Sequence, residues 1–185
     1  IVSMMAANNE TGVLQPWLEA AELCRERGIR FHCDATQWAG KLPLSDLAGC
    51  SSLTASAHKF GGPKGVGFLA SEDPHPFVFG GSQENGRRGG TENYPGIEAM
   101  SVAWHWVNAR LPELSSRSSW RDSFEKTMLE SFPDMKILGF DAPRLWNTST
   151  FVMPDFENLR YVSKLDKLGF EVSTGSACSS GLSKL

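Results

Sequence analysis

The sequence predicts an α/β fold in which a mostly parallel sheet carries helices on its faces and a smaller α+β unit follows. Residues 1–5 are almost continuously apolar, as in a parallel strand buried on both faces. Residues 16–27 have a helical apolar face, with Pro16 near the start and Gly28 just past the end. Residues 29–34 alternate in apolarity, as strands do. Strand, helix and strand in this order predict a βαβ unit, whose ligands bind at the carboxyl ends of the strands.

The later segments continue this pattern. Short strands are expected over 53–56 and 66–70, followed by a glycine-rich functional loop over 79–93. A mostly buried helix is expected from 96 to about 110, ended by Pro112. The remaining predicted elements are a helix over 120–132, strands over 135–138 and 148–153, and a helix over 159–168. The predicted domains are a large domain over 1–95, an interdomain helix over 96–112, and a small α+β domain over 113–185.

Composition excludes several classes of protein. With 41% hydrophobic and 21% charged residues, the 185-residue chain has the composition of a globular protein, which argues against disorder. A net charge of −3 gives no basic footprint for nucleic acid. No segment approaches the ~20 apolar residues that span a bilayer, and no signal peptide is seen, so we expect no membrane partner and a cytoplasmic location.

The four cysteines are scattered and form no C-x-x-C pair, which argues against both a metal site and a disulfide framework. We expect Cys24, Cys33 and Cys50 to be small buried apolar residues. Cys178 differs, because it follows small and polar residues in a segment that cannot easily bury a thiol. An exposed thiolate can act as a nucleophile.

Lys59 is the first candidate for chemistry, because it lies just after a predicted strand and before a glycine-rich turn. An amine on a rigid, partly desolvated element is suited to covalent attachment of a carbonyl compound. Ser56 and His58 beside it can bind a phosphate oxygen and carry a proton. Taken alone, the segment is more typical of a surface lysine before a turn.

Asp34, Gln37 and Asn9 form the context of Lys59, since Asp34 ends a predicted strand and Gln37 and Asn9 each follow one. A buried carboxylate such as Asp34 can hold the proton of a pyridine nitrogen, which makes that ring an electron sink. Gln37 and Asn9 can donate hydrogen bonds to an oxygen substituent on such a pyridine ring. Singly, Asp34 is also compatible with a helix cap or turn, and Asn9 with a turn before Gly12.

Taken in order, these segments resemble the class V aminotransferase superfamily, and within it the cysteine desulfurases of the iron–sulfur cluster type. The resemblance covers essentially the whole chain and rests on these motifs: Asn8-Asn9-Glu10-Thr11-Gly12, Asp34-Ala35-Thr36-Gln37, Ser56-Ala57-His58-Lys59, Gly80-Gly81-Ser82-Gln83-Glu84 with Arg88, Gly90-Thr91-Glu92-Asn93, and Ser173-Thr174-Gly175-Ser176-Ala177-Cys178. The chain departs from the pattern at Ser82, where glycine is usual, and at Gly89, where serine is usual.

The resemblance implies the pyridoxal phosphate (PLP)-dependent transferase fold type I, represented by a partial large domain and a smaller C-terminal domain. It implies that Lys59 binds PLP covalently and that Asp34 pairs with the ring nitrogen. Gln37 and Asn9 are expected on the side of the phenolate oxygen or substrate, and Ser56 and His58 at the phosphate, with His58 also relaying protons.

The resemblance further implies that Thr91 reaches the phosphate of a neighbouring subunit in a homodimer. The glycine content of the loop, taken alone, favours a flexible surface loop. Cys178 is expected to take sulfur from L-cysteine as a persulfide and pass it to an acceptor or scaffold protein. The family's phosphate cup, ring-stacking histidine and carboxylate-binding arginine have no counterpart here. We therefore expect a C-terminal part that is inactive alone. Selenocysteine lyase, a transaminase, or a non-catalytic remnant are the alternatives.

Overall fold

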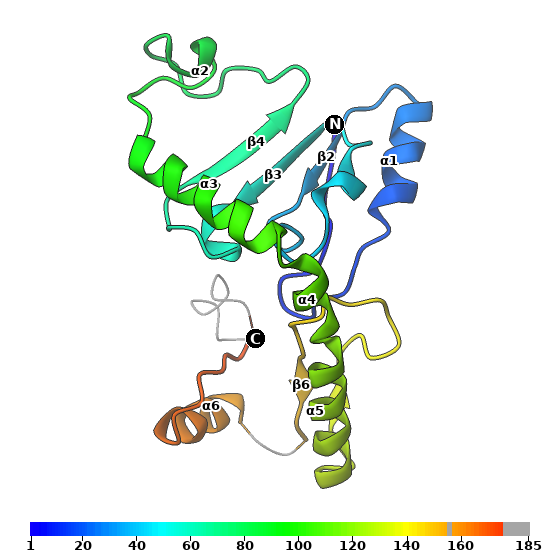
Figure 1. Cartoon of the computed structure of the whole chain (residues 1–185). Coiled ribbons are helices and arrows are strands. Elements are labelled where there is room, and N and C mark those ends of the chain that lie inside the picture. The colour runs from blue at the N-terminus through cyan, green and yellow to red at the C-terminus, as the bar shows by residue number, and fades with distance from the viewer. Residues whose placement is uncertain (155–156, 176–185) are drawn as a thin grey trace. The chain divides into compact units, whose positions relative to one another are not determined.

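The chain forms two compact units in the computed structural model, which describes residues 1–154 and 157–175 (Figure 1). The first unit comprises Ile1–Ala7 and Leu14–Ser116. The second comprises Asn8–Val13 and the chain from Arg117 onward. The division predicted from the sequence, with its separate interdomain helix, stays a prediction.

The first unit is built on a four-stranded sheet in the order β1-β2-β3-β4. The strands are β1 (Val2–Met5), β2 (Phe31–Asp34), β3 (Ser52–Ser56) and β4 (Gly67–Ser71). The pairings β1–β2 and β2–β3 are parallel, and β4 is antiparallel to β3. The prediction of a mostly parallel sheet is therefore confirmed, with all four strands close to their expected positions.

Helix α1 (Trp17–Glu26) covers one face of this sheet, and the side chains packed between helix and sheet form the hydrophobic core of the unit. Phe31 and Cys33 of β2 lie in that core, 1% and 0% exposed. Since side chains alternate along a strand, His32 and Asp34 point to the opposite face. Trp17 packs edge-on against Trp38, with ring centroids 5.7 Å apart.

Helix α3 (Tyr94–Asn108) starts two residues earlier than predicted, because the Asn93 side chain caps it by accepting from the Gly96 amide. The expectation that this helix is mostly buried is wrong. Val102 and Trp106 are 61% and 56% exposed, since the apolar residues run around the helix while only one side packs against the unit.

Several short elements had no clear pattern in the sequence. They are the 3₁₀ turns η1 (Leu44–Leu47) and η2 (Ala57–Lys59) and the helices α2 (Gln83–Gly86) and α4 (Leu111–Ser116). Pro112, expected only to follow α3, lies in the first turn of α4, where a missing amide hydrogen costs nothing. Among the described residues, none of the helices combines the length and apolarity that a membrane crossing requires.

The second unit contains the remaining predicted elements. They are α5 (Ser118–Ser131), β5 (Lys136–Ile137), β6 (Phe151–Val152) and α6 (Asn158–Lys167). The two strands pair antiparallel and are shorter than predicted.

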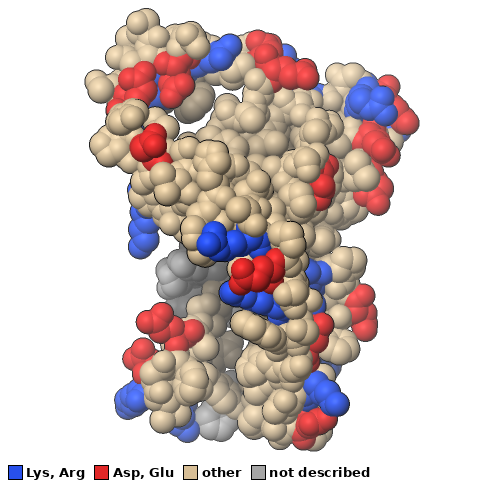
Figure 2. Space-filling model, viewed as in Figure 1, with Lys and Arg blue, Asp and Glu red and all other residues tan. Residues whose placement is uncertain are grey.

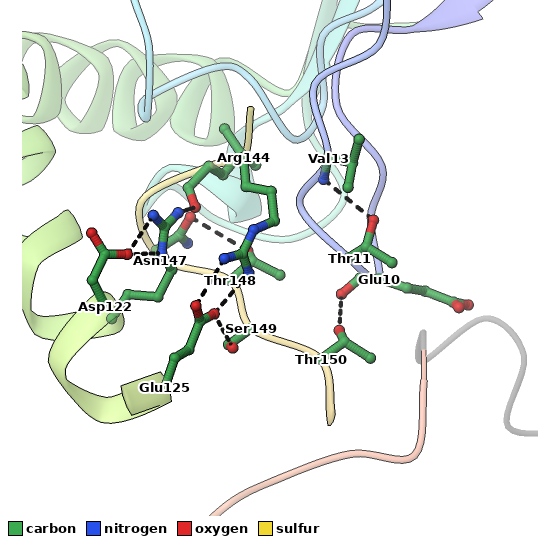
Figure 3. A network of polar contacts seen from close by, with 12 residues as sticks. Glu10, Thr11, Val13, Asp122, Glu125, Arg144, Asn147, Thr148, Ser149 and Thr150 are labelled. Carbon is green, nitrogen blue, oxygen red and sulfur yellow. Dashed lines mark hydrogen bonds and ion pairs between the residues drawn. The ribbon is translucent and has the colours of Figure 1, made fainter. Parts of the chain in front are cut away.

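Residues 8–13 pack with the second unit although they follow β1 in the sequence. The Leu145 amide donates to the Gly12 carbonyl at 2.8 Å, and the Thr150 hydroxyl donates to the Glu10 carbonyl at 2.6 Å (Figure 3). Gly12 has φ +73°, and a Cβ there would lie 2.8 Å from Cβ of Thr148. Glycine is therefore needed at this turn for both conformation and space. No sequence pattern indicated this pairing.

A buried ion pair holds the second unit together (Figure 3). The Arg144 guanidinium donates to both oxygens of the Glu125 carboxylate at 2.7 and 2.8 Å, and their side chains are 4% and 3% exposed. The Ser149 hydroxyl donates to the same carboxylate. Burial by itself raises the pKa of Glu125, but the hydrogen bonds from Arg144 and Ser149 outweigh it and hold the pKa below the ordinary 4.5.

Replacing Arg144 by Met should destabilise the second unit strongly, by about 3–5 kcal/mol, because a carboxylate would stay buried without its partner. Urea unfolding followed by circular dichroism measures this loss. Lys126→Met is the matched control: its ion pair with Glu130 on the same helix is 3.9 Å long and exposed, so little change is expected. Equal losses in the two variants would contradict this account of the ion pair.

Acid should weaken the same unit through Glu125. Because its folded pKa lies below 4.5, the ion pair stabilises the fold fully above that value, and the contribution is lost as the pH falls through the folded pKa. Urea midpoints measured over decreasing pH should fall more steeply for the unmodified chain than for Glu125→Gln, which cannot titrate at this position. Parallel curves would show that another group controls the acid sensitivity.

Candidate active site

The candidate site lies at the carboxyl ends of β2 and β3. These strands are parallel neighbours, with Asp34 opposite Thr54, and the Ala35 amide donates to the Thr54 carbonyl at 2.8 Å. The carboxyl ends of parallel strands meet at the same edge of a sheet. The segments after Asp34 and after Ser56 therefore leave the sheet side by side.

Asp34 is half-buried at the end of β2. One oxygen of its carboxylate, Oδ1, accepts a hydrogen bond from the Thr36 amide at 2.9 Å. This contact is an Asx turn, so the local role considered from the sequence is present. A carboxylate has two oxygens and about four acceptor positions, which leaves acceptor capacity beyond the turn.

Gln37 lies in a tight turn anchored to the core. The Trp38 and Ala39 amides both donate to the Ala35 carbonyl, at 3.0 and 2.8 Å. The indole of Trp38, only 5% exposed, donates to the Pro43 carbonyl at 2.9 Å. These contacts fix the backbone of Gln37, whose side chain is half-buried.

The η2 turn carries His58 and Lys59 directly after β3. Ala57 is fully buried, and its carbonyl accepts from the Phe60 and Gly62 amides at 3.0 and 2.9 Å. A Cβ at Gly62 would lie 2.8 Å from Cβ of Ala57, so glycine lets the chain close over Ala57. His58 and Lys59 are exposed, and the partial desolvation expected for Lys59 is not seen in this chain.

Lys41 is the buried lysine beside this turn, and the sequence did not reveal it. It is 7% exposed, and its ammonium donates to the Lys59 carbonyl at 3.3 Å. Burial lowers the pKa of Lys41 to about 8, assisted by the positive charge of Lys59. The preceding Gly40 has φ +73°, and a Cβ there would lie 2.4 Å from Cβ of Phe60. The segment from Gly40 to Lys41 therefore packs directly against the η2 turn.

A chain of polar contacts crosses the sheet on the face of Asp34. The Ser3 hydroxyl lies 2.7 Å from Nδ1 of His32, and Nε2 of His32 lies 3.0 Å from the Thr54 hydroxyl. Three neighbouring strands are linked in this way, which keeps this face polar while the other face forms the core.

Thr91 is exposed in the glycine-rich loop, which extends from the end of the sheet strand β4 (Figure 1). The loop has internal contacts: the Gly89 amide donates to the Val78 carbonyl at 2.7 Å, and the Gly90 amide to the Gln83 side chain at 3.2 Å. These bonds give the loop a defined shape. The role of Thr91 toward another subunit stays a prediction.

The structure does not test two of the predicted site residues. Asn9 is exposed and belongs to the second unit, where its neighbour Asn8 forms the turn by accepting from the Glu10 and Thr11 amides. Cys178 lies outside the described residues. The roles of Asn9 and Cys178 stay predictions.

The other cysteines behave as expected for small buried residues. Cys24 and Cys33 are buried, and Cys50 is half-buried. Burial, followed by the neighbouring Cys50 thiol and Asp34, raises the pKa of Cys33 to about 12. Burial also raises the pKa of Cys50, against a hydrogen bond from Cys33. Thiols with raised pKa values are poor nucleophiles near neutral pH.

A hollow of about 500 Å³ lies in the second unit, and its lining contains none of the predicted site residues. Its lining includes Arg121, Leu129, Phe140 and the buried pair Glu125 and Arg144. On the face seen in Figure 2, acidic and basic side chains are interspersed on both units and do not gather by sign.

Comparison with known proteins places this geometry in a family. The chain is 43% identical to a cysteine desulfurase of Enterobacter agglomerans over 98% of its own length and 46% of that protein. Its structure matches a NifS-like protein of Rickettsia africae with a TM-score of 0.85 and 29% identity, covering 95% of this chain and 50% of the other. It also matches SspA, solved in complex with cysteine, with a TM-score of 0.72 and 30% identity over 97% and 50% of the two chains.

The chain therefore spans about half the length of the curated relatives that it matches. The structural neighbours confirm the predicted fold, that of the NifS-like PLP-dependent enzymes of fold type I. The sequence profile described as "Aminotransferase class-V" matches residues 1–185. Because this match covers the whole of its length, the chain belongs to the class V aminotransferase family.

Proposed function

We propose that this chain supplies the lysine-bearing part of a PLP-dependent cysteine desulfurase, which takes sulfur from L-cysteine and releases L-alanine. The observation that carries the proposal is the pairing of β2 with β3, which puts Asp34 and Lys59 on segments that leave the same sheet edge. The relatives named cysteine desulfurase support the choice of reaction within the family.

The residues at the strand ends fit PLP by their chemistry. Asp34 offers a half-buried carboxylate with spare acceptor capacity for a ring nitrogen. Lys59 offers an exposed amine on a turn fixed by two backbone hydrogen bonds. Ser56 and His58 add a hydroxyl and an imidazole next to that amine, which suit phosphate oxygens. When bound, PLP supplies an electron-accepting ring that stabilises negative charge beside an amino-acid α-carbon.

The chain's own residues then have distinct tasks. Lys59 binds the cofactor covalently through Nζ and afterwards moves protons at the substrate. Asp34 holds the proton of the ring nitrogen through its carboxylate. Gln37 donates a hydrogen bond to the ring oxygen, and Asn9 binds on the same side. His58 relays protons beside the phosphate.

Cys178 carries the sulfur in this proposal. Its thiolate forms an S–S bond to the sulfur of cysteine while the C–S bond of the substrate breaks. The electron pair of that bond stays with carbon, which takes up a proton and leaves as alanine. The persulfide on Cys178 then goes to an acceptor or scaffold protein of iron–sulfur cluster assembly.

The assembly and location of the enzyme are part of the same proposal. The exposed Thr91 in its ordered loop suits a contact to the phosphate of a second subunit, which makes the enzyme a homodimer. A cytoplasmic location fits a sulfur-transfer reaction of free thiols. Because the chain spans about half of its relatives, we expect no alanine release from the 185-residue chain alone.

Lys59→Ala should abolish covalent attachment of PLP at the η2 turn, because Lys59 is the exposed lysine of that turn and the neighbouring Lys41 is buried against its carbonyl. The adduct is trapped by borohydride reduction and located by peptide mass spectrometry. Lys64→Ala, which removes an exposed lysine five residues on, is the matched control and should leave the adduct intact. If Lys59→Ala keeps the adduct in full, the proposed anchor is wrong.

Cys178→Ala should stop sulfur transfer while leaving PLP attachment unchanged, because the thiol acts on the substrate and not on the cofactor. Alanine release from cysteine is measured in a fusion of the chain with the half of the Enterobacter agglomerans enzyme that it does not match. Cys50→Ala is the control and should retain turnover. Full turnover by Cys178→Ala would favour another class V activity, such as selenocysteine lyase or a transaminase.

A further inference from the structure

Three charged side chains are buried among the described residues, those of Lys41, Glu125 and Arg144. Glu125 is neutralised by Arg144, so its burial has a structural explanation. The ammonium of Lys41 donates to a backbone carbonyl, that of Lys59. A buried ammonium loses hydration, which is costly, and the hydrogen bond to the Lys59 carbonyl offsets part of that cost.

The backbone around Lys41 is fixed to the core. Its amide and that of Leu42 donate to the Trp38 carbonyl at 3.0 and 3.1 Å. Trp38 is held in turn by its ring contact with Trp17 and by its hydrogen bond to Pro43. The backbone that carries the Lys41 side chain is therefore fixed in position.

The other end of the contact is the turn that presents Lys59. The Lys59 carbonyl lies at the end of the three-residue η2 turn, where carbonyls lack partners within the turn itself. Phe60, the next residue, contacts Trp104 edge-on with centroids 5.5 Å apart and adjoins Gly40 closely. Lys41 thus adds a charged donor to a turn whose following residue, Phe60, already packs against Trp104 and Gly40.

We propose that Lys41 is a positioning residue for Lys59, holding the Lys59 backbone by its hydrogen bond so that the Lys59 amine is presented from one fixed place at the strand ends. This inference rests on the proposed function and deepens it. It assigns to Lys41 no contact with substrate or cofactor.

The charge state of Lys41 gives this role a pH signature. Lys59 is the charged group that acts on Lys41, and together with burial it brings the pKa of Lys41 to about 8. Below that pH the donor is an ammonium, and a hydrogen bond from a charged donor is the stronger kind. The hydrogen bond from Lys41 to the Lys59 carbonyl should therefore weaken as the pH rises through about 8.

The test measures how fast PLP attaches to Lys59 in the 185-residue chain, by borohydride trapping and peptide mapping. The exposed Lys64 in the same chain is the internal reference, so the readout is the ratio of labelling at Lys59 to labelling at Lys64. In Lys41→Met the ratio should fall about tenfold, the size expected for losing one hydrogen bond from a charged donor. Lys41→Arg, which keeps a charged donor, should restore most of it.

The pH profile of the ratio completes the test. In the unmodified chain the ratio should decline as the pH passes about 8, and in Lys41→Met that inflection should disappear. A merely structural lysine would not place an inflection there. Lys41→Arg keeps a charged donor that does not titrate in this range, so it should also lose the inflection, and it serves as the second variant if Lys41→Met fails to fold.

The outcomes separate the two proposals. A ratio near one in the unmodified chain would contradict the anchor role of Lys59 and, with it, the need for positioning. A high ratio that is unchanged in Lys41→Met and shows no inflection would overturn the role of Lys41 while leaving the anchor in place.

Discussion

The parallel pairing of β2 with β3 is the constraint on which the candidate site depends. Because Asp34 lies opposite Thr54, the carboxylate and the turn bearing Lys59 leave the sheet at the same edge. The hydrophobic core fixes both segments where they leave the sheet, because Ala35 and Ala57 directly follow the two strands and are fully buried. Small buried residues at these points let the backbone turn tightly and leave the polar side chains on the outside.

The second unit depends on a different kind of interaction. Its strands are two residues long, so backbone pairing contributes little, and the buried pair of Glu125 and Arg144 joins α5 to the segment before β6. Residues 8–13 also belong to this unit, through the bonds of Gly12 and Glu10. The segment directly after β1, which contains Asn9, therefore packs with residues from much later in the chain.

The sequence predicted the elements that have a strong apolar periodicity. It did not predict features that depend on tertiary contacts, such as the burial of a particular side chain. The strands and α1 follow from apolar patterns and from Pro16 and Gly28. Asp34 and Lys59 could be identified because residue type and position after a strand suffice to suggest chemistry. Lys41 could not, since nothing in its neighbours shows that a lysine will be buried against a carbonyl eighteen positions later. The exposure of Val102 and Trp106 was missed because periodicity shows which residues are apolar and not what covers them.

The central claim is that Asp34 and Lys59 serve one cofactor from neighbouring strand ends. A crystal structure of the chain soaked with PLP tests it most directly. The account predicts continuous density from Nζ of Lys59 to the cofactor, with an Asp34 oxygen about 2.7–3.2 Å from the ring nitrogen, within hydrogen-bond range. Cofactor density attached to another lysine, or a ring nitrogen facing away from Asp34, would contradict it.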